Sequence, residues 1–300
     1  MKKAVLDIGS NSIKYLLVDF GKRQQLQVLK DESATTRLAH GIEKTQMLGE
    51  EAMAETLRVT DGYADDARGV GAEKIIAVAT SAARDARNRT DFETRFKEIT
   101  GVDLLVLTGI QESTLIFKGA ISDPAFPQED VVVMDVGGGS AEWILGRKGQ
   151  IVEQCSLPLG CVRLTERFLV GDPYSEGSFY EMTHFLEKEI YGIGESFRLE
   201  NRGLVATGGS ACALAGLTCA MENRHEPVHG CLLDLDQVEA YVDLLRHTPL
   251  KEREKLPGIP PGRADIVTAG AAVFAAAMRV LGAERVMVSA RGLRYGALYM

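Results

Sequence analysis

The chain has 300 residues, of which 45% are hydrophobic and 25% are charged, and this excludes a disordered, collagen-like or coiled-coil protein. Its 34 Lys and Arg residues against 42 Asp and Glu residues give a net charge of −8, which argues against a basic nucleic-acid-binding protein. An anionic ligand would therefore have to be bound by a local basic cluster and backbone amides.

No hydrophobic run reaches the ~20 residues that a membrane-spanning helix needs. The most apolar stretch, residues 268–281, is too short, and the apolar run near the N-terminus is too brief for a signal peptide. The 5 cysteines include no Cys-x-x-Cys pair, so we expect buried thiols rather than disulfides or zinc ligands. We expect a cytoplasmic protein that binds neither membranes nor nucleic acids.

An internal repeat is the most informative feature of the sequence. Residues 5–18 read VLDIGSNSIKYLLV and residues 133–146 read VMDVGGGSAEWILG, and the two align without a gap. In this alignment Asp7 matches Asp135. Each copy has a β-rich run that ends near an Asp, then a glycine-containing turn and a second alternating run, which predicts a β-hairpin with a polar tip. The duplication predicts two related α/β domains that face each other.

Strand and helix patterns alternate between and after the two hairpins. In the first half, we predict strands at 26–31, 74–79 and 103–107, and helices at 49–69, 89–99 and 111–119. In the second half, we predict helical regions at 175–199 and 235–245, a strand at 285–289 and a helix at 293–300. Such alternation indicates mostly parallel sheets with both faces covered. The Pro-containing segment 123–127 predicts a boundary between domains 1–124 and 125–300, and the helix at about 292–300 is a candidate to pack back on the first domain.

Three glycine-containing turns are candidate phosphate-binding loops, because backbone amides approach an anion closely where no Cβ intervenes. The residues of the two hairpin tips are Gly9, Ser10, Asn11 and Ser12, and Gly137, Gly138, Gly139 and Ser140. The third turn, Thr207-Gly208-Gly209-Ser210, follows a predicted strand and opens a helix, whose N-terminus favours anions. One such turn is often only structural, but two matched copies favour a ligand. Asp7 and Asp135, beside the tips, suit a hard cation such as Mg²⁺ that accompanies phosphate.

Two charged residues in the first half are candidates for chemistry. Arg84 follows the predicted strand 74–79, so it lies at the carboxyl end of that strand, where open α/β sheets bind ligands, and its guanidinium suits phosphate. Glu112 lies in the first turn of a predicted helix, where the helix dipole alone favours a carboxylate. The alternative is a general base that takes a proton from water attacking phosphorus.

Other basic side chains and the histidines carry weaker signals. Arg163 follows a predicted turn and Arg291 follows the last predicted strand, and each is compatible with an ordinary surface charge. His225 and His229 have the spacing of paired metal ligands, but Pro227 between them argues against a helical metal site.

These motifs, in their order along the chain, resemble those of the Ppx/GppA phosphatase family, the exopolyphosphatases and guanosine pentaphosphate phosphohydrolases, in a short two-domain form. The matching segments are residues 7–12, 79–88, 109–117, 135–143, 157–168, 206–210, 258–271 and 288–298. The resemblance implies an α/β fold of duplicated actin-like (ribonuclease H-like) domains with a cleft between them, as in the actin, sugar-kinase and heat-shock-chaperone superfamily.

The resemblance also implies roles for individual residues. Glu112 matches the catalytic glutamate of the family, and Glu142 matches an acidic residue linked to both metal and water, together with Asp7 and Asp135. The three glycine turns match its phosphate loops, and Arg84 matches its arginine. Two positions depart from the family pattern: Thr114 stands where an arginine is usual, and Ala290 where an aspartate is usual.

From this resemblance we expect an exopolyphosphatase that releases terminal orthophosphate from inorganic polyphosphate, with Mg²⁺ as cofactor or Mn²⁺ in its place. One alternative is a guanosine pentaphosphate (pppGpp) 5′-phosphohydrolase. A second is a sensor that binds polyphosphate or this alarmone and hydrolyses it weakly, and a third is an ATP-dependent kinase of the same superfamily. We expect a homodimer, the commonest symmetric assembly.

Overall fold

The computed structural model describes residues 1–21, 26–199, 202–223 and 227–300. The chain forms two compact units, which we call unit 1 (Met1–Gly119 with Leu293–Met300) and unit 2 (Ala120–Gly292). The division falls before the predicted boundary after residue 124, because the segment that follows Gly119 packs within unit 2. There Asp123 pairs with Arg291, and the ring of Phe126 lies 4.7 Å from that of His229.

Unit 1 is built on a five-stranded sheet in the order β3-β2-β1-β4-β5. Its strands are β1 (Lys2–Ile8), β2 (Ser12–Phe20), β3 (Leu26–Thr35), β4 (Lys74–Ala79) and β5 (Leu104–Val106). The predicted hairpin is formed by β1 and β2, which pair antiparallel with Asp7 opposite Lys14. The strands β1, β4 and β5 are parallel, so their carboxyl ends meet at one edge of the sheet.

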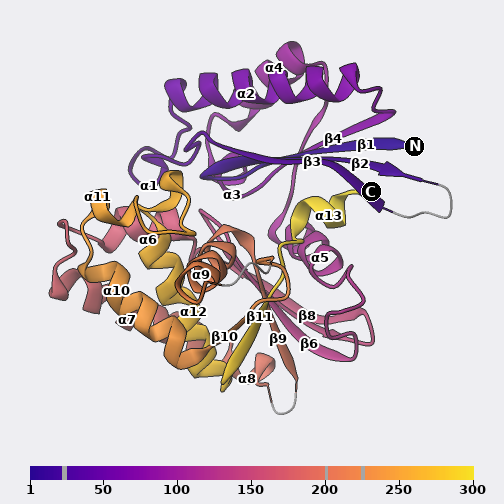
Figure 1. Ribbon diagram of the computed structural model, residues 1–300. Helices are drawn as coiled ribbons and strands as arrows, with labels where there is room; N and C mark the ends of the chain where they lie inside the picture. Colours follow the sequence, from indigo (N-terminus) through magenta and orange to yellow (C-terminus); the bar gives the residue numbers. More distant parts are fainter. Residues whose placement is uncertain (22–25, 200–201, 224–226) are drawn as a thin grey trace. The chain divides into compact units, whose positions relative to one another are not determined.

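Helices cover both faces of the unit 1 sheet (Figure 1). On one side lie α2 (Glu50–Gly69) and α4 (Arg89–Thr100), and on the other lie α5 (Gly109–Ala120) and the C-terminal α13 (Leu293–Ala297). The short helices α1 (Ile42–Thr45) and α3 (Ser81–Asp85) complete the unit. A glycine lets α13 approach α5, because a Cβ at Gly296 would lie 1.9 Å from the carbonyl oxygen of Leu115.

Unit 2 is built on a six-stranded sheet in the order β10-β11-β9-β6-β7-β8. Its strands are β6 (Asp130–Val136), β7 (Ala141–Arg147), β8 (Gln150–Leu157), β9 (Gly203–Thr207), β10 (Leu232–Asp234) and β11 (Arg285–Val288). The second predicted hairpin is confirmed: β6 and β7 pair antiparallel, with Asp135 opposite Glu142. The strands β6, β9 and β11 are parallel and again end at one edge.

The helices of unit 2 pack around α12 (Val267–Leu281). The neighbours of α12 include α6 (Cys161–Phe168), α7 (Glu176–Tyr191), α8 (Gly194–Phe197), α9 (Gly208–Met221) and α10 (Leu235–His247). The short α11 (Leu250–Arg253) lies between α10 and α12 in the sequence. The predicted helical region 175–199 is thus two helices, α7 and α8. The apolar stretch 268–281 is the buried core helix α12. Among the described residues, no helix has the length and apolar character needed to span a bilayer.

Candidate functional site

The segments that follow the three parallel strands of unit 1 converge at the carboxyl edge of the sheet. The first hairpin tip (Gly9–Ser12, called the first tip below) follows β1, α3 follows β4, and α5 begins shortly after β5. The amide of Thr80 donates to the carbonyl oxygen of Ile8 at 3.3 Å, and the hydroxyls of Ser10 and Ser81 lie 3.0 Å apart. The sequence elements that were predicted to be functional in this half of the chain therefore meet at the carboxyl edge of the sheet.

Backbone hydrogen bonds hold the first tip from behind. The amide of Gly9 donates to Ser12 O at 3.1 Å, and a Cβ at Gly9 would lie 2.9 Å from the same oxygen, so this tight turn needs glycine. The loop at residues 36–39 donates two amides to Asn11 O and one to Ser10 O. The carbonyl oxygens of Ser10 and Asn11 thus point toward the loop at residues 36–39. The negative ends of these two peptide dipoles therefore lie on the side of the tip that faces this loop.

Asp7, at the base of the first tip, is a buried carboxylate. It is 5% exposed, and Lys14 Nζ lies 4.0 Å from its Oδ2. Burial raises the pKa of Asp7 above its usual range, because it disfavours the charged form, and the positive charges of Lys14 and Arg294 oppose this effect. A cation beside Asp7 would favour the ionised form, so its environment fits a role as a ligand for a hard divalent ion.

Arg84 and Glu112, predicted separately, are brought together by the fold. Arg84 Nη1 donates to Glu112 Oε2 at 2.8 Å and to Leu107 O at 3.1 Å. Glu112 is 5% exposed, and Arg84 is held from the other side by Asp85, 3.7 Å from its Nε. The candidate general base and the candidate phosphate clamp are therefore partners of each other in this structure.

In unit 2 the second tip (Gly137–Ser140) and the third turn (Thr207–Ser210) are adjacent. Asp135, before the tip, is in register with Thr207. Gly208 has a φ of +90°, and a Cβ there would lie 2.4 Å from Asp135 Oδ1. Glycine is thus required at 208 both for its backbone conformation and for the close approach of Asp135.

The N-terminus of α6 holds the second tip. The amide of Cys161 donates to Gly137 O at 2.9 Å, and the amide of Val162 donates to Gly138 O at 2.8 Å. Arg163 Nε donates to Gly139 O at 3.0 Å. The structure therefore places Arg163, which the sequence left open as a surface charge, directly at the tip.

The sequence reasoning missed Arg263. Its guanidinium lies over the third turn: a Cβ at Gly209 would be 2.1 Å from Arg263 Nη2. Arg263 ends a short 3₁₀ helix (Pro261–Arg263) that leads into α12. The signal was present in the Pro-Pro-Gly-Arg sequence ahead of the most hydrophobic helix, but only the fold brings this segment to the N-terminus of α9.

Glu142 is deeply buried. It is 0% exposed, and its Oε1 accepts a hydrogen bond from Ser156 Oγ on β8 at 2.8 Å. In the parts of the chain that the structure describes, no group of three or more His, Cys, Asp or Glu residues is arranged to hold a metal ion. A single carboxylate with substrate phosphates and water suffices for Mg²⁺, so Asp7 within unit 1 and Asp135 within unit 2 each fit as a ligand of this type. His225 lies outside the described residues.

Comparison with known proteins gives consistent matches. The sequence model of the Ppx/GppA phosphatase family matches residues 17–300. An exopolyphosphatase 2 of Mycobacterium tuberculosis is 33% identical over 281 residues, which is 90% of this chain and 88% of that protein. A crystal structure of the Aquifex aeolicus family member is similar with a TM-score of 0.81 and 30% identity, over 99% of this chain and 96% of that one. A crystal structure of an exopolyphosphatase from Cytophaga hutchinsonii is similar with a TM-score of 0.93 and 25% identity, over 100% and 97% of the two chains.

Proposed function

This chain belongs to the Ppx/GppA phosphatase family and has its duplicated actin-like fold, and we propose that it is a hydrolase of phosphoanhydride bonds, an exopolyphosphatase that releases terminal orthophosphate from inorganic polyphosphate. The observation that carries the proposal is the Arg84–Glu112 pair beside the first tip. It combines a carboxylate that can act as a base with a cation that can bind phosphate.

Substrate binding has to overcome the charge of a polyanion in a protein whose net charge is −8. In unit 1, Arg84 and the first tip supply a guanidinium and backbone amides for phosphoryl oxygens. In unit 2, the third turn opens α9, whose N-terminus favours anions, and the guanidinium of Arg263 lies over this turn. Arg163 adds positive charge beside the second tip. These groups give each unit its own phosphate-binding elements.

The ion pair suggests how the base becomes active. A phosphoryl group that reaches Arg84 competes with Glu112 for the same guanidinium nitrogens, because both ligands are anionic oxygens. Glu112 released in this way accepts a proton from water. The water oxygen then forms a bond to the terminal phosphorus while the bridging P–O bond breaks. Orthophosphate leaves, and the shortened polyphosphate keeps the electron pair of the broken bond.

Mg²⁺ is part of the proposal, with Mn²⁺ as its replacement. Asp7 within unit 1 and Asp135 within unit 2 are each a candidate carboxylate ligand for it, and when bound it would offset the negative charge on the phosphoryl oxygens. We expect a chelator to abolish phosphate release, and added Mg²⁺ to restore it.

The test is phosphate release from medium-chain polyphosphate and from pppGpp, measured side by side with Mg²⁺. The E112Q variant removes the base, and K118Q, an exposed change near the end of the same helix, is the matched control. We expect release from polyphosphate that E112Q strongly reduces and K118Q retains. Faster release from pppGpp would replace polyphosphate with the guanosine nucleotide as the substrate. Tight binding without release would instead show a sensor.

A further inference from the structure

A segment at the carboxyl end of β11, residues 289–292, borders the third turn in unit 2. The amide of Ser289 donates to Ala206 O at 2.8 Å, and the hydroxyl of Thr207 donates to Arg291 O at 3.4 Å. A Cβ at Gly292 would lie 2.8 Å from Thr207 Oγ1, so the segment packs closely against this residue. Its position therefore affects the turn to which we assign phosphate binding.

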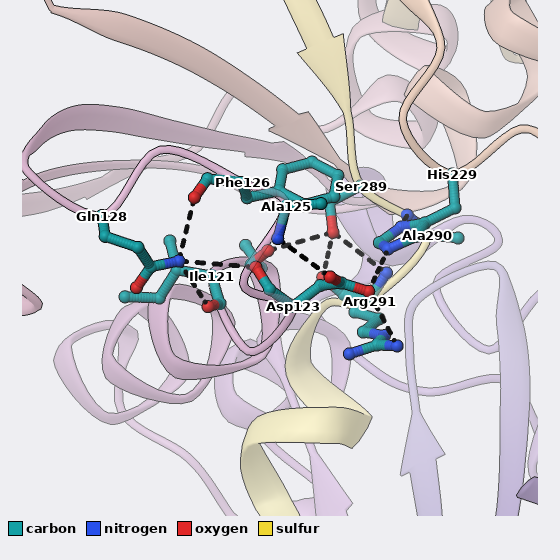
Figure 2. Close-up of polar contacts among 10 residues, drawn as sticks. Ile121, Asp123, Ala125, Phe126, Gln128, His229, Ser289, Ala290 and Arg291 are labelled. Carbon is teal, nitrogen blue, oxygen red and sulfur yellow. Dashed lines mark hydrogen bonds and ion pairs between the residues drawn. The ribbon is translucent and has the colours of Figure 1, made fainter.

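His229 ties this segment to a second one, residues 120–128 (Figure 2). The amide of Ala290 donates to His229 Nδ1 at 3.1 Å, and His229 Nε2 lies 3.3 Å from Asp123 Oδ2. The ring also lies against that of Phe126, with 4.7 Å between centroids. Because Nδ1 accepts a hydrogen bond, it carries no proton; the neutral ring therefore has its proton on Nε2 and donates it to Asp123.

Asp123 is the second member of the same cluster. Its carboxylate accepts from the amide of Ala125 at 3.0 Å and pairs with Arg291 Nη2, also at 3.0 Å. Ser289 Oγ adds a bond to Ala120 O at 3.2 Å. The segments 120–128 and 289–292, at the two ends of unit 2, are thus joined by side chains from both and by His229 from a third loop (Figure 2).

We propose that His229 and Asp123 are positioning residues for the phosphate-binding turn Thr207–Ser210. They act through Ala290, which bonds to His229, and through Arg291, whose carbonyl oxygen accepts from Thr207; neither His229 nor Asp123 needs to touch the substrate. The proposal rests on the proposed function, since it assigns the turn a phosphate ligand. It gives a role to a histidine that the sequence offered only as a weak metal candidate.

The arrangement makes the positioning sensitive to protonation. A proton on Nδ1 turns the acceptor into a donor that faces the Ala290 amide, and this bond is lost. Among the residues that the structure describes, the charged groups at the ring are Asp123, which contacts Nε2, and Arg291, which shares the Asp123 carboxylate; Phe126 and Ala290 bring no charge. The Ala290 anchor is therefore present in the neutral form of His229.

Two substitutions separate the two bonds of the ring. In H229N the amide oxygen takes the position of Nδ1 and can accept from Ala290, whereas the contact with Asp123 is lost. In H229Q the amide group reaches the Nε2 position toward Asp123, and the Ala290 amide loses its acceptor. H247N is the matched control, because His247 is an exposed histidine whose Nδ1 contacts Asp243 O, a carbonyl of its own helix α10.

Hydrogen–deuterium exchange of the full-length protein tests the positioning without any assay of activity. H229Q should speed exchange of the peptides that contain Ala290 and Gly208, by roughly three- to tenfold for the loss of one hydrogen bond. H229N should exchange these peptides like the wild type and H247N. Equal exchange in H229Q and the wild type would overturn the proposal.

Kinetics with polyphosphate give the second readout. We expect H229Q to raise KM by about three- to tenfold with a smaller change in kcat. H229N should keep the KM near that of the wild type, because its amide oxygen can still accept from Ala290. Equal KM values for H229Q and the wild type would contradict the role of Nδ1. If no variant or wild type hydrolyses polyphosphate, the proposed function fails, and the exchange data still decide the positioning by His229.

Discussion

Arg84 Nη1 and Glu112 Oε2 lie 2.8 Å apart, although the two residues are 28 positions apart in the sequence. In the free protein this ion pair satisfies a buried carboxylate, and during the proposed reaction the same guanidinium binds phosphate. Arg84 thus has two alternative anionic partners, Glu112 and phosphate. Removing the Glu112 carboxylate should therefore affect phosphate binding and turnover in different ways.

We therefore predict opposite effects of E112Q on the two properties. Turnover of polyphosphate should fall by about 10²–10⁴, because the general base is lost. Binding of orthophosphate should tighten by roughly three- to tenfold, because a neutral amide competes less for Arg84. Isothermal titration with orthophosphate and a steady-state assay measure the two. Weaker phosphate binding by E112Q, with K118Q unchanged, would contradict the competition between Glu112 and phosphate.

The glycine at position 208 offers a test of the close contact with Asp135. G208A should lower the free energy of unfolding by about 1–3 kcal/mol, because a Cβ at φ +90° is strained and would meet Asp135 Oδ1 at 2.4 Å. G149A is the matched control: Gly149 has φ +71° and nothing within 4 Å of its Cβ position. Urea unfolding of both variants separates the cost of the backbone conformation from that of the contact. Equal losses in the two variants would assign the whole effect to the backbone.

Arg263 and Gly209 should behave as a unit. R263M removes the guanidinium. G209A displaces it, because the new methyl group would lie 2.1 Å from the present position of Arg263 Nη2. Each variant should raise the KM for polyphosphate about tenfold or more, as expected for a charge-assisted hydrogen bond. The double variant should lose little more than R263M alone, because both changes remove the same interaction. Additive losses in a double-mutant cycle would show that Gly209 contributes independently of Arg263.

Asp66 in unit 1 provides a pH-dependent test away from the site. The Lys30 ammonium, 2.6 Å from Asp66 Oδ1, lowers the pKa of this carboxyl by more than burial raises it, and the hydroxyl of Tyr15, 2.8 Å from Oδ2, lowers the pKa further. Since the pKa is lower in the folded state, the ionised form stabilises the protein at neutral pH. This contribution is lost as the pH falls below about 4, through the folded-state pKa.

The variant D66N should therefore be less stable than the wild type at pH 7, and the difference should shrink in acid. D65N is the neighbouring control, because the side chain of Asp65 is 72% exposed and pairs with Arg68 of its own helix. Thermal unfolding at a series of pH values measures both. A difference between the wild type and D66N that stays constant down to pH 3 would rule out this linkage.

Much of the fold could be predicted because its signals are local. The hairpins repeat one sequence pattern, and the alternation within each copy predicts the two strands; the structure adds the registers, Asp7 opposite Lys14 and Asp135 opposite Glu142. The strands of the first half were predicted for the same reason, since a run such as residues 74–79 is apolar whatever surrounds it. The compact units divide after Gly119 rather than after residue 124, because Asp123 and Phe126 pack on distant residues, and such packing leaves no mark in the local sequence.

The sequence by itself determined the duplicated α/β architecture, the family resemblance and the residue types at the two tips and the third turn. Only the tertiary structure decided which side chains are partners: Arg84 with Glu112, Arg263 over Gly209, and His229 between Ala290 and Asp123. The physical reason is the range of the interactions. Secondary structure and turns depend on residues a few positions apart, whereas these contacts join strand ends and loops that become neighbours only when parallel strands align at one edge of a sheet.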